Sequence, residues 1–193
     1  MITREKAEQL LDKYITTEWL KLHMRETEVI MHKLAQHFDE DKDLWGITGL
    51  LHDIDYDYVG KDPERHVIEF GKILEMENLN IGEDIPKEMY HAIKAHYEEH
   101  PQISQKRESK LDFALSSAEN LSGFLVACAL VQPDKKIASV GVESVIKKFR
   151  KKDFAKAVNR NLIYDIEKTG ISLEQFVQIS LDAVNEISDE IGL

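Results

Sequence analysis

The chain has 193 residues, and its 25 basic and 36 acidic side chains give a formal net charge of −11. This acidity argues against broad electrostatic attraction to nucleic acid or to an anionic membrane surface. The single cysteine, Cys128, excludes an intramolecular disulfide framework and any cysteine-rich zinc site. The length is that of one domain with a sizeable core.

Hydrophobic periodicity predicts an all-α fold, because nearly every segment repeats its apolar residues at helical spacing and Pro and Gly are few. The first helix is expected over residues 3–16 and the second over residues 18–38. Asp41 or Asp43 can cap a third helix, whose apolar run ends at His52.

The middle of the chain predicts two further helices, each opened by a proline. Asp62 is a natural N-cap for a fourth helix that runs to about Glu77, with His66 in its second turn. A fifth helix begins at Pro86 and carries His91 and His96 near its far end. These two histidines are five positions apart, so they lie on different faces, and we favour His96 as the inward one.

The rest of the chain begins with a long helix over residues 110–131, which is apolar nearly all round, as a central helix would be. Shorter amphipathic helices are expected over 142–150 and 153–168, with Gly170 as a C-cap. A capping-box pattern opens a last helix over residues 172–191.

These helices are expected to form a single domain over residues 1–193, with a core of about residues 18–131 on which the helices of 132–193 pack. The start of the chain is charged and shows no signal-peptide pattern, and no apolar run looks long enough to span a bilayer. We therefore expect a soluble cytoplasmic protein with no membrane partner. The sequence does not define an oligomeric state.

The stretch "GLLHDIDYDY", residues 49–58, carries an apolar helix into a group of ionisable residues. The pair His52-Asp53 is followed by two more acids, Asp55 and Asp57. Buried side chains of this kind must be hydrogen-bonded, paired or bound to metal.

Further imidazoles and one carboxylate fall on other predicted helices, as in bundle proteins that build metal sites from inward-facing side chains. Nitrogen and oxygen donors suit Fe, Mn, Zn, Ni or Co, with Mg as another candidate, and the lack of thiolate argues against a structural zinc centre. The candidate ligands are His23, His52, Asp53, His66, His96 and Glu119.

The order His23, His52-Asp53 and a later acid resembles the HD-domain superfamily of metal-dependent phosphohydrolases. The resemblance covers residues 18–131, and residues 132–160 are similar to a compact bacterial and archaeal subgroup of predicted hydrolases. It implies that the His, His-Asp and acid side chains bind one metal. His66 and His96 then correspond to ligands of a second metal, or to phosphate contacts, in HDIG-type and dinuclear members.

One position departs from the subgroup pattern. The acid before "xLxG" is aspartate in the subgroup, whereas "SSAENLSG" provides Glu119, whose extra methylene moves the carboxylate. Asp112 is a poorer substitute because it lies on a different turn of the same helix.

The resemblance implies a hydrolase that uses metal-activated water on a phosphate ester of a small molecule or nucleotide. Asp53 would bridge two ions if a second is bound, and Asp55 or Asp57 would orient the attacking water or protonate the leaving group. The expected phosphate contacts are Lys61, Arg65, Lys94 and Arg107.

Two other functions are compatible with the same residues. Glu119 leaves open a catalytically weak HD module that binds a nucleotide or a protein partner and uses its metal structurally. A di-iron oxygenase is a third reading, because some HD relatives use the same six-ligand shell for oxygen chemistry.

Overall fold

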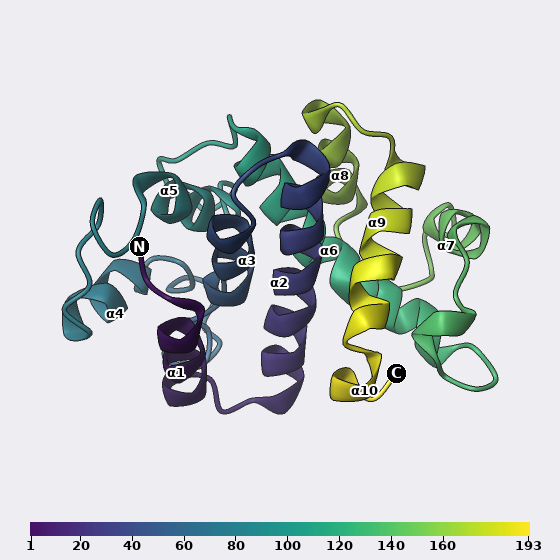
Figure 1. Ribbon diagram of the computed structural model, residues 1–193, viewed down its shortest axis with the longest axis horizontal. Helices are drawn as coiled ribbons and strands as arrows, with labels where there is room; N and C mark the ends of the chain where they lie inside the picture. Colours follow the sequence, from purple (N-terminus) through teal and green to yellow (C-terminus); the bar gives the residue numbers. More distant parts are fainter.

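Two long helices organise the structure (Figure 1), which is a computed structural model describing residues 1–193. Helix α2, Glu18–Phe38, lies between α3, Lys42–Leu51, and α9, Leu173–Glu186. Helix α6, Lys110–Leu130, packs against α2 and against most of the C-terminal elements. The structure contains helices and no strand, so the predicted all-α fold is confirmed.

The remaining helices flank this centre on two sides. Helices α1, α4 and α5 lie beyond α3, whereas α7, α8 and α10 lie on the side of α9 (Figure 1). Their bounds are α1 Arg4–Tyr14, α4 Phe70–Met76, α5 Lys87–Ala95, α7 Val142–Phe149, α8 Arg160–Tyr164 and α10 Ser188–Ile191, with 3₁₀ turns η1 Ile137–Ser139 and η2 Asp165–Thr169.

Helices α1, α3 and α6 begin where the sequence predicts, and a side chain caps each of them. The Thr3 hydroxyl accepts from the Lys6 amide at the start of α1, and Asp41 caps α3. Ser109 and Asp112 form a reciprocal capping box at the start of α6. Each of these contacts joins residues within one turn, which is why the sequence alone predicts them.

The predicted fourth helix is wrong at its start. Residues 63–69 form turns, and α4 begins at Phe70 instead of at Asp62. Val67 has a φ of 66°, a left-handed conformation that ends any right-handed helix. Its carbonyl accepts a hydrogen bond from Nζ of the buried Lys94 at 2.7 Å, which holds the turn in place. His66 therefore lies in a turn and not on a helix.

The single helix predicted over residues 153–168 is also wrong. Turns occupy residues 152–157, and only the short α8 and η2 follow. The Arg160 guanidinium donates to the carbonyls of Phe149, Lys151 and Phe154, so these carbonyls are turned away from helical amides. The last predicted helix breaks at Ile187, where the chain passes from α9 to α10.

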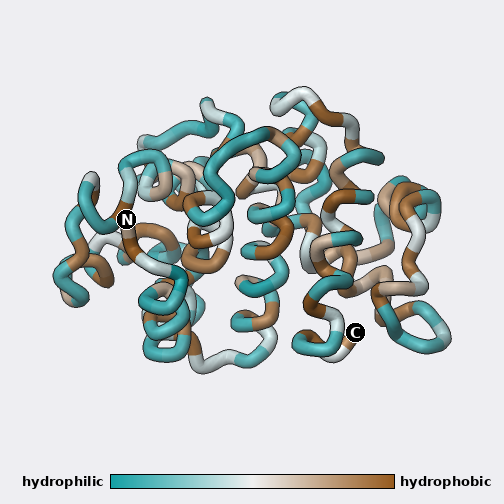
Figure 2. The backbone as a smooth tube through the Cα atoms, viewed as in Figure 1, coloured by the Kyte–Doolittle hydropathy of each residue, from teal (hydrophilic) through white to brown (hydrophobic).

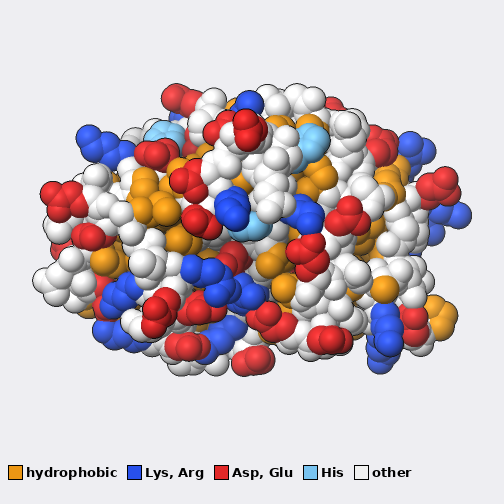
Figure 3. Space-filling model, viewed as in Figure 1, with side chains coloured by type: hydrophobic (Ala, Val, Ile, Leu, Met, Phe, Trp, Pro, Cys, Tyr) orange, Lys and Arg blue, Asp and Glu red, His pale blue; other side chains and the backbone are white.

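The hydrophobic core is one continuous cluster of 46 buried residues that runs from Ile2 to Ile191. Hydrophilic and hydrophobic residues alternate along α2, as the two faces of an amphipathic helix require (Figure 2). Acidic and basic side chains are interspersed over the face in Figure 3.

Helix α6 is the most apolar long helix of the chain. Its length and composition would allow it to cross a membrane, contrary to the prediction from apolar runs. Most of it is buried beneath α2, α5, α8 and α9, as in the core helix of a water-soluble domain.

The close approach of α3 to α2 depends on Gly49. A Cβ atom at this position would lie 2.9 Å from the Thr27 carbonyl oxygen and 3.1 Å from the Glu28 Cα atom. No real Cβ atom tolerates such a contact with backbone, so a side chain here would push the two helices apart.

We predict that Gly49→Ala lowers the free energy of unfolding by about 1–3 kcal/mol, because the added methyl group overpacks the α2–α3 contact. The control is Gly46→Ala on the same helix, where the nearest atom is 3.6 Å away and the helix gains about 1 kcal/mol of propensity. Urea unfolding followed by circular dichroism measures both. Equal stability of the two variants would contradict the role given to Gly49.

Glu77 joins the end of α4 to α1. Its carboxylate accepts hydrogen bonds from Lys13, from the Tyr14 hydroxyl at 2.7 Å and from Lys6 at 3.4 Å. The bonds from Lys13 and Tyr14 lower the pKa of Glu77 from its ordinary 4.5 to about 2. The carboxylate therefore stabilises the fold above pH 4.5, and this contribution is lost as pH falls towards 2.

We predict that Glu77→Gln lowers the free energy of unfolding at pH 7 by about 1 kcal/mol, a modest amount because both lysines are largely exposed. The difference from the unmodified protein should shrink as the pH falls from 4.5 to 2. Glu75→Gln, an exposed acid on the same helix, is the charge-matched control. A difference that persists unchanged at pH 2 would rule out the ionised carboxylate as its source.

Candidate metal centre

Four imidazoles surround the carboxylate of Asp53. Its Oδ1 atom lies 3.2 Å from Nε2 of His66, 3.5 Å from Nε2 of His52 and 3.6 Å from Nε2 of His96. Its Oδ2 atom lies 3.8 Å from Nε2 of His23. Ligand atoms held about 2 Å from one metal ion are separated from each other by distances of this order.

Separate segments of the chain bring these side chains together. His23 lies on α2, and His52 ends α3, so that Asp53 stands in the turn that follows. His66 comes from the turn before α4, and His96 is the C-cap residue of α5.

The second ring nitrogen of each histidine is already bonded. Nδ1 of His52 donates to the Gly49 carbonyl at 2.8 Å, and Nδ1 of His96 donates to the Ile93 carbonyl at 2.7 Å. A carbonyl can only accept, so both rings carry a proton on Nδ1, and Nε2 is the atom that faces Asp53. This is the arrangement that orients histidine ligands in metal sites.

Side chains, and not backbone carbonyls, bond the Nδ1 atoms of His66 and His23. Nδ1 of His66 lies 2.9 Å from Oδ1 of Asp55. Nδ1 of His23 lies 2.9 Å from the Ser122 hydroxyl, which donates in turn to the Glu119 carbonyl at 2.8 Å. With the Ser122 proton used in this way, His23 also carries its own proton on Nδ1 and directs Nε2 at Asp53.

The donor set fits a divalent metal ion. Nε2 of His23 and Nε2 of His52 lie only 3.2 Å apart. Burial lowers the pKa of His52 to about 3 and also lowers that of His23, so both rings are neutral. Two facing lone pairs repel each other unless a cation lies between them, and imidazole with carboxylate suits Fe, Mn, Zn, Ni or Co.

His66 differs from the other rings in its charge. Burial opposes protonation, but the carboxylates of Asp53 and Asp55 prevail and raise the pKa of His66 to about 10. In the metal-free protein a proton therefore occupies the position in which a metal would bind, and metal binding has to release it.

Two overlapping groups of ligands share Asp53. One consists of His23, His52 and Asp53, and the other of Asp53, His66 and His96, with ligand atoms within 4.8 Å of one another in each. The geometry therefore accommodates either one ion or two ions bridged by Asp53.

Glu119 belongs to neither group. Burial and the nearby charge of Asp53 raise the pKa of its carboxyl well above the ordinary value, and the side chain accepts a hydrogen bond from Asn120. Its role as a ligand stays a prediction. Asp112, the alternative acid, caps α6 instead.

The catalytic roles predicted for Asp55 and Asp57 do not match the positions of these residues. Asp55 is buried and bonds the Nδ1 side of His66, away from Asp53. Asp57 accepts from the backbone amides of Thr16 and Thr17 at 2.8 Å and so anchors the start of α2. Asp55 therefore orients one ligand ring, and Asp57 fixes the segment that leads into α2.

Most of the predicted phosphate contacts are also occupied elsewhere. Lys94 is buried and bonded to the Val67 carbonyl, and Arg65 pairs with Glu69 on the surface. Arg107, 5% exposed, donates to the Ala95 and His96 carbonyls and pairs with two glutamates. Lys61 Nζ lies 3.8 Å from Oδ1 of Asp57 and 6.0 Å from the centre of the Trp19 ring, which lines the cavity beside the centre.

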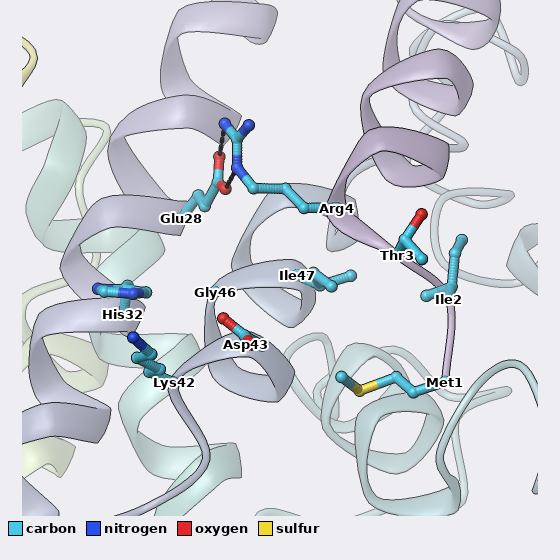
Figure 4. Close-up of a pocket in the computed structure, with 10 residues that line it drawn as sticks. All are labelled: Met1, Ile2, Thr3, Arg4, Glu28, His32, Lys42, Asp43, Gly46 and Ile47. Atoms are coloured by element: carbon cyan, nitrogen blue, oxygen red, sulfur yellow. Dashed lines mark hydrogen bonds and ion pairs between the residues drawn. The ribbon is translucent and has the colours of Figure 1, made fainter.

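A cavity of about 560 Å³ opens beside the metal centre, and His23 and Asp53 form part of its wall. A second cavity, of about 320 Å³, lies between the N-terminal segment, α2 and α3 (Figure 4). There the Arg4 guanidinium is bonded to the Glu28 carboxylate, and none of the candidate ligands is present. Of these two cavities, the first is therefore the one that reaches the candidate metal centre.

Sequence reasoning did not find Ser122 or Glu26. Ser122 stands three residues after Glu119 in "ENLSG", so one helical turn separates them, but nothing local shows that its hydroxyl meets His23 from a distant helix. Glu26 follows His23 by three positions on α2, a spacing that places both on one face.

The family model for the HD domain matches residues 22–122, which include every candidate ligand. The chain belongs to the HD domain family. HD domains form a superfamily of metal-dependent hydrolases, and the His/Asp centre described above is the corresponding candidate metal site in this member. Neither a curated protein nor a solved structure matches the chain.

We predict that Ser122→Ala weakens metal binding about 10- to 100-fold, because the Nδ1 proton of His23 loses its buried acceptor and the ring is no longer oriented. Titration of Zn²⁺ or Mn²⁺ against a competing chelator measures the affinity. Ser116→Ala is the matched control, since this buried hydroxyl on α6 has no hydrogen-bond partner. Equal affinities of the two variants would exclude Ser122 as a support of the centre.

Proposed function

We propose that this HD domain is a divalent-metal-dependent phosphohydrolase that cleaves the phosphate ester of a small molecule, with nucleotides among the candidates. The single observation that carries the proposal is the convergence of four Nε2 atoms on Asp53, each ring fixed through its Nδ1 atom. A bound divalent ion lowers the pKa of its water and offsets negative charge on the phosphoryl group.

The protein's own residues have distinct parts in this proposal. His23, His52 and Asp53 form one ligand group, and His66 with His96 forms the other around the shared carboxylate. Asp55 holds His66 in place, and the cavity beside His23 admits the substrate. Lys61, which lies over Trp19 and pairs with Asp57, is the proposed cation for an entering phosphate.

The protein is further proposed to act in the cytoplasm on a free small molecule, without a nucleic-acid or membrane partner. Its net charge of −11 supports this, because an acidic surface does not attract other polyanions.

We predict that Asp53→Asn reduces the metal content of the purified protein at least about tenfold and reduces phosphatase activity to the background rate. The carboxylate is the one ligand shared by both groups, and an amide cannot replace its charge. Elemental analysis and hydrolysis of p-nitrophenyl phosphate measure the two effects. His37→Asn, at an exposed histidine, is the control. A wild-type protein that binds none of Fe, Mn, Zn, Ni, Co or Mg would contradict the proposal.

A second candidate function is a catalytically weak module with a structural metal. The position of Glu119 outside both ligand groups favours it. The substitution Glu119→Asp distinguishes the phosphohydrolase from the catalytically weak module. A gain of tenfold or more in phosphatase rate, which is about what one catalytic interaction contributes, would identify a weakened site. Substantial and equal rates in both forms would rule that candidate out. Two irons per chain together with oxygen uptake would instead indicate the oxygenase.

A further inference from the structure

The cavity beside the metal centre has a mainly apolar wall. Its volume of about 560 Å³ is in the range of pockets for drug-sized organic molecules. The aromatic and aliphatic side chains that line it come from α2, α6, the turn after α3 and residues 191–193, and they are Trp19, Leu22, Tyr56, Val126, Leu130, Ile191 and Leu193. We call this cavity the Glu26 pocket.

No lysine or arginine lines the Glu26 pocket. Lys61, whose side chain is 45% exposed, lies over Trp19 and pairs with Asp57. The other cations near the centre, Lys94 and Arg107, are bonded to backbone carbonyls and to acids. A second phosphoryl or carboxylate group in the pocket would therefore lose its hydration without gaining a partner.

Glu26 is the unusual polar residue of this wall. Its side chain is 4% exposed and makes no hydrogen bond or ion pair within the protein. Burial raises the pKa of Glu26 to about 8, which agrees with a neutral carboxyl group in an apolar wall. A neutral carboxyl offers one O–H donor and one carbonyl acceptor, and Glu26, as part of the wall, can present both to a molecule in the cavity.

We propose that the Glu26 pocket binds the uncharged, largely apolar organic group of a phosphomonoester, with Trp19 against its flat face and Glu26 hydrogen-bonded to a polar atom at its edge. The proposal rests on the proposed function and narrows it to monoesters of uncharged, mainly aromatic or apolar alcohols. Polyphosphates and substrates with a second charge are excluded because the pocket has no cation.

The reaction assigned to this substrate is hydrolysis. The oxygen of water forms a bond to phosphorus, the ester oxygen–phosphorus bond breaks, and the ester oxygen takes the proton that water gives up. The products are inorganic phosphate and the free alcohol. The alcohol is left in the Glu26 pocket and the phosphate at the metal centre.

The first test changes the charge of the pocket. Leu130→Lys places a cation at its exposed edge, and Val131→Lys, also exposed but not part of the wall, is the control. The unmodified protein should hydrolyse 1-naphthyl phosphate with a kcat/KM at least about tenfold above that for 4-carboxyphenyl phosphate. Leu130→Lys should lower this ratio of kcat/KM values about fivefold, because the new cation favours the carboxylate substrate. Val131→Lys should leave the ratio unchanged. No preference in the unmodified protein, or equal effects of the two lysines, would overturn the proposal.

The second test addresses Glu26. The ring carbonyl of 4-methylumbelliferyl phosphate can accept a hydrogen bond, whereas 1-naphthyl phosphate has no such group. Glu26→Leu should lower kcat/KM for the first relative to the second about tenfold, and Glu26→Gln, which keeps a donor, should retain the ratio. An unchanged ratio in Glu26→Leu would remove Glu26 from substrate recognition.

A binding measurement separates this proposal from the proposed function. Metal-free protein should bind 1-naphthol, detected by calorimetry, and Trp19→Ala and Leu130→Lys should weaken that binding while Val131→Lys does not. Binding of this kind without hydrolysis of any phosphomonoester would refute the phosphohydrolase and leave the pocket assignment standing. Hydrolysis without substrate preference and without 1-naphthol binding would refute the pocket assignment alone.

Discussion

The structure depends on the close approach of four imidazole nitrogens to the carboxylate of Asp53. Such an arrangement is unfavourable without a cation, because the neutral rings of His23 and His52 direct lone pairs at each other. The fold tolerates it because each ring is fixed by a separate hydrogen bond to Gly49, Ile93, Asp55 or Ser122. The close α2–α3 contact then brings His23 to His52. The metal-free protein therefore carries the energetic cost of this repulsion, and metal binding removes it.

The distribution of the other charges follows from this centre. Lys94 and Arg107, which by position would suit a phosphate, instead hold the turn at Val67 and the end of α5. They stabilise the segments that carry His66 and His96, and neither of them lines the Glu26 pocket. In the proposed function the metal centre therefore compensates the charge of the substrate, while the adjoining wall provides apolar contacts and the neutral Glu26 carboxyl.

Much of the fold could be predicted from the sequence because helical periodicity and caps such as Ser109 are local signals. The grouping of His23, His52-Asp53, His66 and His96 was predictable too, since polar residues on apolar faces must share partners. The left-handed turn at Val67 was not, because it depends on a lysine 27 positions away on α5. The hydrogen bond between Asp55 and His66 could not be predicted either, because it depends on how the turn at Val67 places His66.

The turn after α3 places an acid at every second position, and each acid serves a different part of the molecule. Asp53 faces the ligand rings, Asp55 holds His66, and Asp57 anchors the threonines that begin α2. The intervening Ile54 is buried in the core, and Tyr56 contributes to the pocket wall. A single inserted or deleted residue would misdirect all of these side chains at once. We therefore expect the length of this turn to be fixed. Insertions and deletions among relatives should fall in segments whose side chains hold no part of the centre, such as residues 133–136 between α6 and η1.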